Sequence, residues 1–246
     1  MEYLNRQFKD VKNIKLDLGS GIYLKKGFIG IDNYVGLKSQ TDNPNIIKEM
    51  SLPVIQHDLS QGIPFEDNSV SEIRTSHFLE HCHFFDRLLE EVYRVLMPKG
   101  VFDIVVPYAN SAEGMYAGHI VFFTEKWFLE NLLFNTLFEI KQIIFYESEY
   151  YALHRKTINK LFTFDQARLF LFNCCFQMQI IALRKDGRAA PKGDETIEYL
   201  YKKNPFVRYP FLQGIASLFT SSSRSEVRKK IEYSTIPYGS NKEQHE

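Results

Sequence analysis

The chain of 246 residues lacks several features that would assign it to common classes of protein. Its 30 basic and 30 acidic side chains cancel, so no net charge favours nucleic acid as a partner. No apolar run reaches the length of a membrane span, and the first ten residues lack the apolar core of a signal peptide. These absences predict a soluble, cytoplasmic protein.

Cysteine is also scarce, with only Cys82, Cys174 and Cys175 in the whole chain. Three is an odd number, their spacing is not that of metal ligands, and adjacent cysteines rarely pair with each other. We therefore expect buried free thiols in a reducing compartment.

Two nucleotide-binding motifs are missing as well. The dinucleotide fingerprint needs a third glycine at residue 24, which is Leu24, and its acidic residue should follow about 20 positions on. Asp32 comes far sooner than that. No Gly-Lys-Ser/Thr is present, so a P-loop is excluded.

Three apolar runs of strand length are present, over residues 14–21, 28–32 and 54–58, and each ends at a glycine or a carboxylate. In an open parallel sheet these ends lie at the carboxyl edge, where ligands bind. A glycine turn lets the backbone approach a ligand, and a carboxylate after the second strand can accept hydrogen bonds from ribose hydroxyls. The pattern predicts a nucleoside-bearing cofactor, and S-adenosylmethionine (SAM) fits it better than NAD or ATP. The residues that we expect to bind this cofactor are Asp17, Gly19, Ser20, Gly21, Asp32, Asn33, Asp58, Leu59 and Ser76.

Further strands and helices alternate along the chain, as an α/β sheet requires. Apolar residues predict strands over 70–76, 101–107, 138–147 and 176–184, and an amphipathic helix over 84–96. Thr124 is expected to cap a helix over 125–133 through its hydroxyl. A helical insertion is expected at about 150–173, where it either forms part of a substrate pocket or covers the core.

The character of the chain changes after Arg184, where a linker over 185–194 precedes an aromatic segment and a basic helix over 224–231. We therefore divide the chain into a domain over 1–185 and a C-terminal extension over 186–246. This extension either packs on the domain or docks, as a peripheral segment, on a membrane or a protein partner.

These residues resemble class I SAM-dependent methyltransferases, and in particular a small, type 11-like subgroup associated with polysaccharide biosynthesis. The motifs that carry the resemblance are Leu16-Asp17-Leu18-Gly19-Ser20-Gly21, Phe28-Ile29-Gly30-Ile31-Asp32, Asp58-Leu59, Ile63-Pro64-Phe65-Glu66-Asp67-Asn68-Ser69, Ser76-His77-Phe78-Leu79-Glu80-His81, Arg94-Val95-Leu96-Met97-Pro98 and Val106-Pro107. The likeness covers about residues 14–185. It implies a Rossmann-like fold with a mostly parallel seven-stranded sheet and an antiparallel last strand. Ser71 and Lys99 depart from the family pattern without touching the expected cofactor contacts.

The connection between the first two strands is unusually short for this fold. Parallel strands generally need a crossover of a dozen or more residues with a helix, and residues 22–27 leave no room for one. We expect a shortened first crossover that encloses the methionine end of the cofactor less completely.

Residues 77–83 hold the densest set of reactive side chains. His77, Glu80 and His81 match an inverted zinc-protease motif, but that motif must lie on a helix and His77 directly follows an expected strand. We therefore expect no metal site here, and we expect Glu80 and His81 to brace the loop.

Methyl transfer from a sulfonium is an in-line displacement, so positioning supplies much of the catalysis. A hydroxyl acceptor also benefits from a base, for which histidine suits neutral pH. The resemblance implies His77 as the first candidate for this base and His119 as the second. For each, the alternative is a structural histidine that caps a helix or bonds a backbone group.

The resemblance implies a SAM-dependent methyltransferase that O-methylates a sugar or glycan intermediate. A second hypothesis is methylation of another small molecule or of a protein. A third is a SAM-fold partner protein without its own activity, tethered through its extension.

Overall fold

The computed structural model describes residues 8, 13–21, 24–33, 54–188 and 231–240. The basic helix expected over 224–231 lies, apart from its last residue, outside the described residues. The same holds for most of the extension and for the chain between residues 33 and 54. The boundary between domain and extension therefore stays a prediction.

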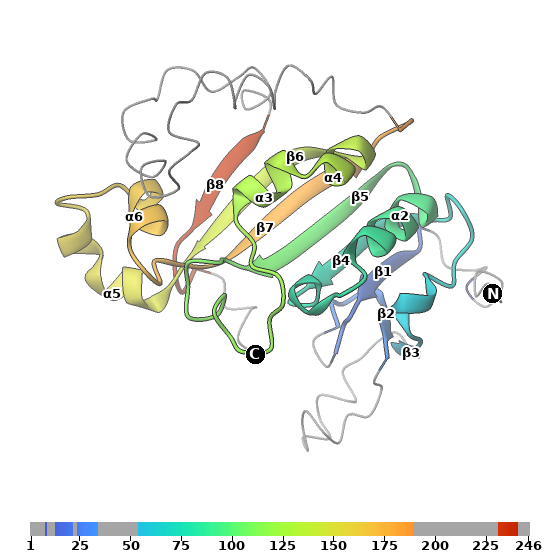
Figure 1. Cartoon of the computed structure of the whole chain (residues 1–246), viewed down its shortest axis with the longest axis horizontal. Helices are drawn as coiled ribbons and strands as arrows, with labels where there is room; N and C mark the ends of the chain where they lie inside the picture. The colour runs from blue at the N-terminus through green and yellow to red at the C-terminus, as the bar shows by residue number, and fades with distance from the viewer. Residues whose placement is uncertain (1–7, 9–12, 22–23, 34–53, 189–230, 241–246) are drawn as a thin grey trace.

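The described chain forms one eight-stranded sheet in the order β3-β2-β1-β4-β5-β7-β6-β8 (Figure 1). In chain order the strands are β1 (Lys15–Leu18), β2 (Ile29–Asp32), β3 (Val54–Gln56), β4 (Val70–Ser76), β5 (Leu96–Pro107), β6 (Phe138–Glu147), β7 (Cys175–Arg184) and β8 (Glu232–Ile236). Strand β7 is antiparallel to both of its neighbours, and the other pairs are parallel. The Rossmann-like α/β fold with an antiparallel final domain strand is confirmed.

Strand β8 was not expected from the sequence. It comes from the C-terminal extension and lies parallel to β6, with Gln142 opposite Glu232 and Tyr146 opposite Ile236. Part of the extension is therefore built into the sheet and covers the edge that β6 would otherwise present.

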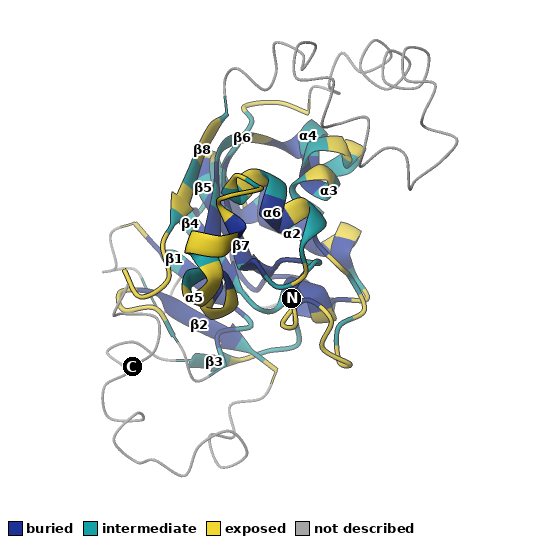
Figure 2. Ribbon diagram, turned by 90° about the vertical axis from the view of Figure 1, so that its left-hand side faces the viewer, coloured by how far each residue is buried: buried dark blue, intermediate teal, exposed yellow. Residues whose placement is uncertain are grey.

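Three helices, α2 (Phe85–Val95), α3 (Glu125–Glu130) and α4 (Leu132–Leu137), lie on one face of the sheet (Figures 1 and 2). Helix α2 is amphipathic as predicted, because Leu88, Leu89 and Val92 are fully or almost fully buried on one side. Between β6 and β7 come α5 (Glu149–Ile158) and α6 (Phe164–Phe170). In Figure 2 the strands are mostly buried and α5 is mostly exposed.

The expected helix over 125–133 is in fact two short helices. Asn131 separates them, and its side chain accepts a hydrogen bond from the N–H of Phe134 to start α4. The predicted capping by the Thr124 hydroxyl is wrong, because its side chain makes no capping hydrogen bond. The backbone carbonyl of Thr124 instead accepts from the N–H of Trp127 at 3.0 Å.

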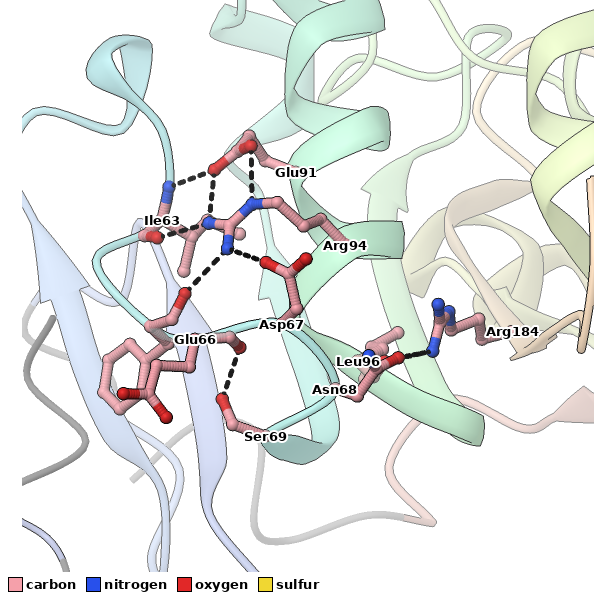
Figure 3. A network of polar contacts seen from close by, with 10 residues as sticks. Ile63, Glu66, Asp67, Asn68, Ser69, Glu91, Arg94, Leu96 and Arg184 are labelled. Carbon is pink, nitrogen blue, oxygen red and sulfur yellow. Dashed lines mark hydrogen bonds and ion pairs between the residues drawn. The ribbon is translucent and has the colours of Figure 1, made fainter. Parts of the chain in front are cut away.

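Arg94 on α2 joins two of the family-like motifs into one structural unit (Figure 3). Its guanidinium donates to the carbonyls of Ile63 and Phe65, at 2.8 and 2.9 Å, and pairs with the carboxylates of Asp67 and Glu91. Glu91 in turn accepts from the N–H of Ile63 at 2.8 Å. Arg94 therefore fixes the turn that leads into β4, the strand that ends next to His77.

The chain order places the switch point of the sheet between β1 and β4. From β1 the chain runs outward through β2 and β3, then returns to place β4 on the other side of β1. A crevice opens at such a point, beyond the carboxyl ends of the strands. Residues 19–21 and 77–81 follow β1 and β4, and so lie at this edge.

The three cysteines are free and buried, as the sequence analysis predicted for the thiols themselves. Among the described residues, no helix combines the length and the apolar character needed to cross a membrane.

Candidate active site

The glycine turn after β1 has a backbone that only glycine adopts readily. Gly19 has φ +65° and Gly21 has φ +50°, values that L side chains disfavour. A Cβ atom on Gly19 would lie 2.3 Å from ring atoms of Phe78. The N–H of Gly19 donates to the carbonyl of Ile31 at 2.8 Å, which ties the turn to β2.

Asp32 at the end of β2 faces this turn. The N–H of Gly21 donates to Oδ2 of Asp32 at 2.9 Å. The carboxylate expected to bind a ribose therefore also holds the glycine turn in place. Asn33, the next residue, is exposed, and its carbonyl accepts from the side chain of Gln56 at 3.3 Å.

Asp17 is the most perturbed carboxylate of the site. It is 2% exposed, and its Oδ2 accepts from the N–H of Lys25 at 3.1 Å. Its Oδ1 is buried without a hydrogen-bond partner among the described residues. Burial raises the pKa of Asp17 to about 6, against the hydrogen bond from Lys25, which lowers it. A buried acceptor of this kind suits a cationic or hydrogen-bonding ligand group.

A row of charged residues crosses the sheet beside Asp17. Arg74 on β4 lies opposite Asp17 in register, and Asp103 on β5 lies opposite Arg74. Arg74 pairs with Asp103 at 3.2 Å, and Lys25 reaches the same carboxylate at 3.5 Å. The short connection between β1 and β2 therefore lays Lys25 over this row, and residues 24–28 contain no helix. This agrees with the predicted shortened crossover.

Ser20 lies between the two glycines of the turn and is buried. Its Oγ has no hydrogen-bond partner among the described residues. A Cβ atom on Gly30 of β2 would come within 2.6 Å of this oxygen. Gly30 thus leaves room for the Ser20 hydroxyl, a contact that the sequence analysis missed because a glycine inside a short strand carries no signal of its neighbour.

The remaining expected cofactor residues lie at the same edge of the sheet. Asp58 follows β3 and begins η3 (Leu59–Gln61), where its Oδ1 accepts from the N–H of Ser60 at 2.9 Å. Hydrogen bonding by the side chain of Ser60, and then by this N–H, lowers the pKa of Asp58. Leu59 is buried, and Ser76 is the half-buried last residue of β4.

His77 has an unusual backbone and two side-chain neighbours. Its φ of +52° is left-handed, and such strain in a non-glycine residue gathers at functional sites. Its Nε2 lies 2.9 Å from Oε1 of Gln177, and its Nδ1 lies 3.5 Å from Oε1 of Glu80. Burial lowers the pKa of His77, but Glu80 and Gln177 outweigh it, so the pKa is raised. Both ring nitrogens face oxygen acceptors, an environment that stabilises the imidazolium.

His119 approaches the same carboxylate from the loop after β5. Its Nε2 is 3.9 Å from Oε1 of Glu80, and its Nδ1 donates to the carbonyl of Gly114 at 3.2 Å. The His119 side chain is only 5% exposed, against 36% for His77. Both candidate bases therefore flank Glu80, and His77 is the more accessible.

Glu80 is the residue whose importance the sequence analysis missed. Its backbone carbonyl accepts from Ile120 and Val121, at 2.9 and 3.2 Å, which ties this segment to the loop after β5. Its side chain is 1% exposed, and neither carboxylate oxygen has a hydrogen-bond partner among the described residues. The fit of Glu80 to His119, which lies 39 positions later, is a tertiary contact without a sequence signal.

The described residues fit a SAM-type cofactor by their own chemistry. The turn offers a bare backbone, Asp17 offers a buried oxygen that no described residue hydrogen-bonds, and Asp32 lies one strand away at the same edge. These groups suit an amino-acid part and a ribose part of one ligand that runs along the ends of the strands.

Comparison with known proteins agrees with this geometry. Residues 18–104 match the model of a family described as "Methyltransferase domain". The match spans the glycine turn, Asp32, Asp58, His77 and Arg94. It supports SAM as the cofactor. None of the curated proteins compared with this chain matches it.

The solved structures to which the chain is similar share little sequence with it. YcgJ from Bacillus subtilis is 16% identical, with 74% of this chain and 97% of that chain covered and a TM-score of 0.47. A SAM-dependent methyltransferase from Archaeoglobus fulgidus is 19% identical, with coverages of 73% and 90% and a TM-score of 0.49. A coclaurine N-methyltransferase bound to N-methylheliamine and SAH is 11% identical, with coverages of 73% and 71% and a TM-score of 0.46. Over residues 18–104 the chain is therefore similar to a methyltransferase domain.

Proposed function

We propose that this chain is a SAM-dependent methyltransferase that transfers a methyl group to a hydroxyl of a sugar or glycan intermediate, with His77 as the base. The observation that carries the proposal is the cluster at the carboxyl edge. There the glycine-specific turn follows β1, the half-exposed His77 follows β4, and Asp17 within β1 has a buried oxygen without a hydrogen-bond partner among the described residues.

The cofactor residues divide by the part of the ligand that each one suits. Oδ1 of Asp17, a buried acceptor without a partner among the described residues, suits the amino group of the methionine part, which is a cation. Asp32 suits the ribose hydroxyls, while Asp58 and Leu59 provide a polar and an apolar contact for the adenine. The cofactor residues that remain are Gly19, Ser20, Gly21, Asn33 and Ser76. The first four would contact the ligand through their backbone, and Ser76 is the last residue of β4, directly before His77.

Bound SAM supplies an electrophilic methyl group on a positively charged sulfur. His77 would hold the acceptor hydroxyl at its Nε2 and would take up the hydroxyl proton when SAM supplies the methyl group. The acceptor takes the place of the Gln177 amide at Nε2, while Glu80 stabilises the resulting imidazolium from the Nδ1 side. The raised pKa of His77 supports this role.

The nature of the acceptor rests on resemblance and on one surface feature. The loop between β5 and α3 carries large apolar side chains that are at least 44% exposed, namely Met115, Tyr116, Ile120 and Phe122. Tyr116 also stacks edge-on against His119, with ring centroids 5.4 Å apart. An exposed aromatic surface beside the base supports an acceptor with a ring, such as a sugar.

The first test is a calorimetric titration of S-adenosylhomocysteine into the full chain. We expect micromolar binding that Asp32→Ala abolishes and that Asp186→Ala, at an exposed carboxylate outside the site, leaves unchanged. Absence of binding to the wild type would contradict the proposed cofactor site. Nucleotide sugars, oligosaccharides, other small molecules and peptides then identify the acceptor class.

A second candidate function follows from β8, which ties the extension to the sheet. In this reading the chain is a partner protein with a methyltransferase fold, whose extension makes the functional contact with a protein or a membrane surface. It predicts that His77→Ala preserves function and that truncation after Arg184 abolishes it. The opposite result favours the enzyme.

A further inference from the structure

We propose that Glu80, His81 and His119 bind a divalent cation of the zinc type, with two imidazole nitrogens and one carboxylate oxygen as protein ligands. One ligand atom from each of these residues lies within 4.8 Å of the other two. This ligand set differs from the sequence motif His77, Glu80 and His81, and it replaces the expectation that the chain has no metal site.

The buried carboxylate is the first observation behind the site. Glu80 is 1% exposed, and both of its oxygens lack a hydrogen-bond partner among the described residues. A buried carboxylate of this kind is costly unless a cation or a proton compensates it. A cation bound between Glu80 and the two histidines would compensate this buried charge.

The hydrogen bonds of the two histidines supply the second observation. Nδ1 of His81 lies 3.0 Å from the carbonyl of Gly118, and Nδ1 of His119 lies 3.2 Å from the carbonyl of Gly114. A carbonyl only accepts, so each Nδ1 carries the proton and each Nε2 keeps its lone pair. Histidines that bind metal are oriented in this way, with the second nitrogen donating to a backbone carbonyl or a carboxylate.

The spacing of the ligands suits one small ion. Nε2 of His119 is 3.9 Å from Oε1 of Glu80, and two ligands about 2.0–2.1 Å from one tetrahedral zinc ion are about 3.4 Å apart. A contraction of about half an ångström brings them to that distance. The rings of His81 and His119 already lie edge-on with centroids 4.8 Å apart.

The donor types select the class of ion. Two histidines and one glutamate form a set that zinc uses at catalytic sites, where a fourth position stays open for water or substrate. His77, with Nδ1 3.5 Å from the same Glu80 oxygen, is then an outer partner of the ligating carboxylate. The ion would hold the η4 segment (Leu79–His81) against the loop at residues 119–121, beside the proposed base.

The test uses the full chain, stripped with a chelator and titrated with Zn²⁺ in competition with a chromophoric chelator. We expect one ion per chain, and we expect Glu80→Gln and His81→Ala to weaken binding by more than the roughly 10–100-fold that loss of an outer partner costs. His83→Ala is the matched control, because His83 is an exposed histidine two positions beyond the site. It should bind as the wild type does.

Two further measurements keep the result clear if a variant folds poorly. Co²⁺ added to the wild type should give the intense visible absorption of a four-coordinate site, and Zn²⁺ should raise its Tm. Absence of stoichiometric binding to the wild type, or equal weakening by His83→Ala, would overturn the proposal. Because none of these readouts needs SAM, failure of the metal site is distinguishable from failure of the methyltransferase assignment.

Discussion

Gly19 and Phe78 occupy adjoining space so tightly that a Cβ atom on Gly19 would lie 2.3 Å from the Phe78 ring. One residue belongs to the turn after β1 and the other follows His77 at the end of β4. The proposed cofactor turn therefore packs directly against the residue that follows the proposed base. A substitution in the turn is expected to displace His77 as well.

Gly19→Ala should lower both stability and affinity for S-adenosylhomocysteine. The left-handed backbone costs a side chain about 1–2 kcal/mol, and overpacking against Phe78 adds about 1–3 kcal/mol. Thermal unfolding and calorimetry measure the two effects. Gly27→Ala, with φ +87° and nothing within 4 Å, carries the backbone cost alone, and Gly187→Ala carries neither cost. A Gly19→Ala protein as stable as Gly27→Ala would contradict the predicted clash.

Asp17→Asn should change the pH dependence of stability. The pKa of Asp17 is 3.8 without perturbation and about 6 in the folded chain, so the folded state binds the proton more tightly. The wild type therefore loses stability as pH rises from about 4 to 6, and the loss stays constant above that range. A rise of the Asp17 pKa from 3.8 to about 6 corresponds to about 3 kcal/mol in the free energy of unfolding.

We accordingly expect the free energy of unfolding of Asp17→Asn, relative to the wild type, to increase between pH 4 and pH 7. Denaturant unfolding at several pH values measures it. Asp186→Asn, at an exposed carboxylate, is the control. If the difference in the free energy of unfolding between Asp17→Asn and the wild type does not vary with pH, the pKa of the Asp17 carboxyl is not raised.

Arg94→Ala should destabilise the fold by about 2–4 kcal/mol, because it removes the donor to the carbonyls of Ile63 and Phe65 and breaks the ion pair with Glu91. The stability of Arg94→Lys should lie between those of the wild type and Arg94→Ala, because an ammonium group cannot reproduce the forked hydrogen bonds of the guanidinium. Urea unfolding gives the values. Arg87→Ala, on an exposed position of the same helix, should stay within about 0.5 kcal/mol of the wild type.

Ending the chain at residue 230 should remove β8 and expose the edge of β6. We expect a loss of about 2 kcal/mol, which is roughly 4–8 °C in Tm, and faster aggregation, because an open strand edge pairs with other chains. Scanning calorimetry and light scattering measure these effects. A chain that ends at residue 240 keeps β8 and should behave as the wild type does. Equal stability of both truncations would mean that β8 contributes nothing to the sheet.

Sequence determined the framework of this protein because its signals are local. Strands at residues 70–76 and 138–147 were predicted with the bounds that the structure shows, since apolar runs bounded by turns fix them. The glycine turn and Asp32 were placed at one sheet edge because parallel strands share their carboxyl ends.

Only the tertiary structure decided which distant residues meet. Glu80 faces His119 across 39 positions, Ser20 lies beside Gly30, and β8 pairs with β6 across about 90 residues. These contacts depend on how loops and edges pack after the sheet has formed, and a side chain in a loop carries no periodic signal of its partner. The positions of the main strands followed from the sequence, whereas the pairing of β8 and the surroundings of Glu80 followed from the packing.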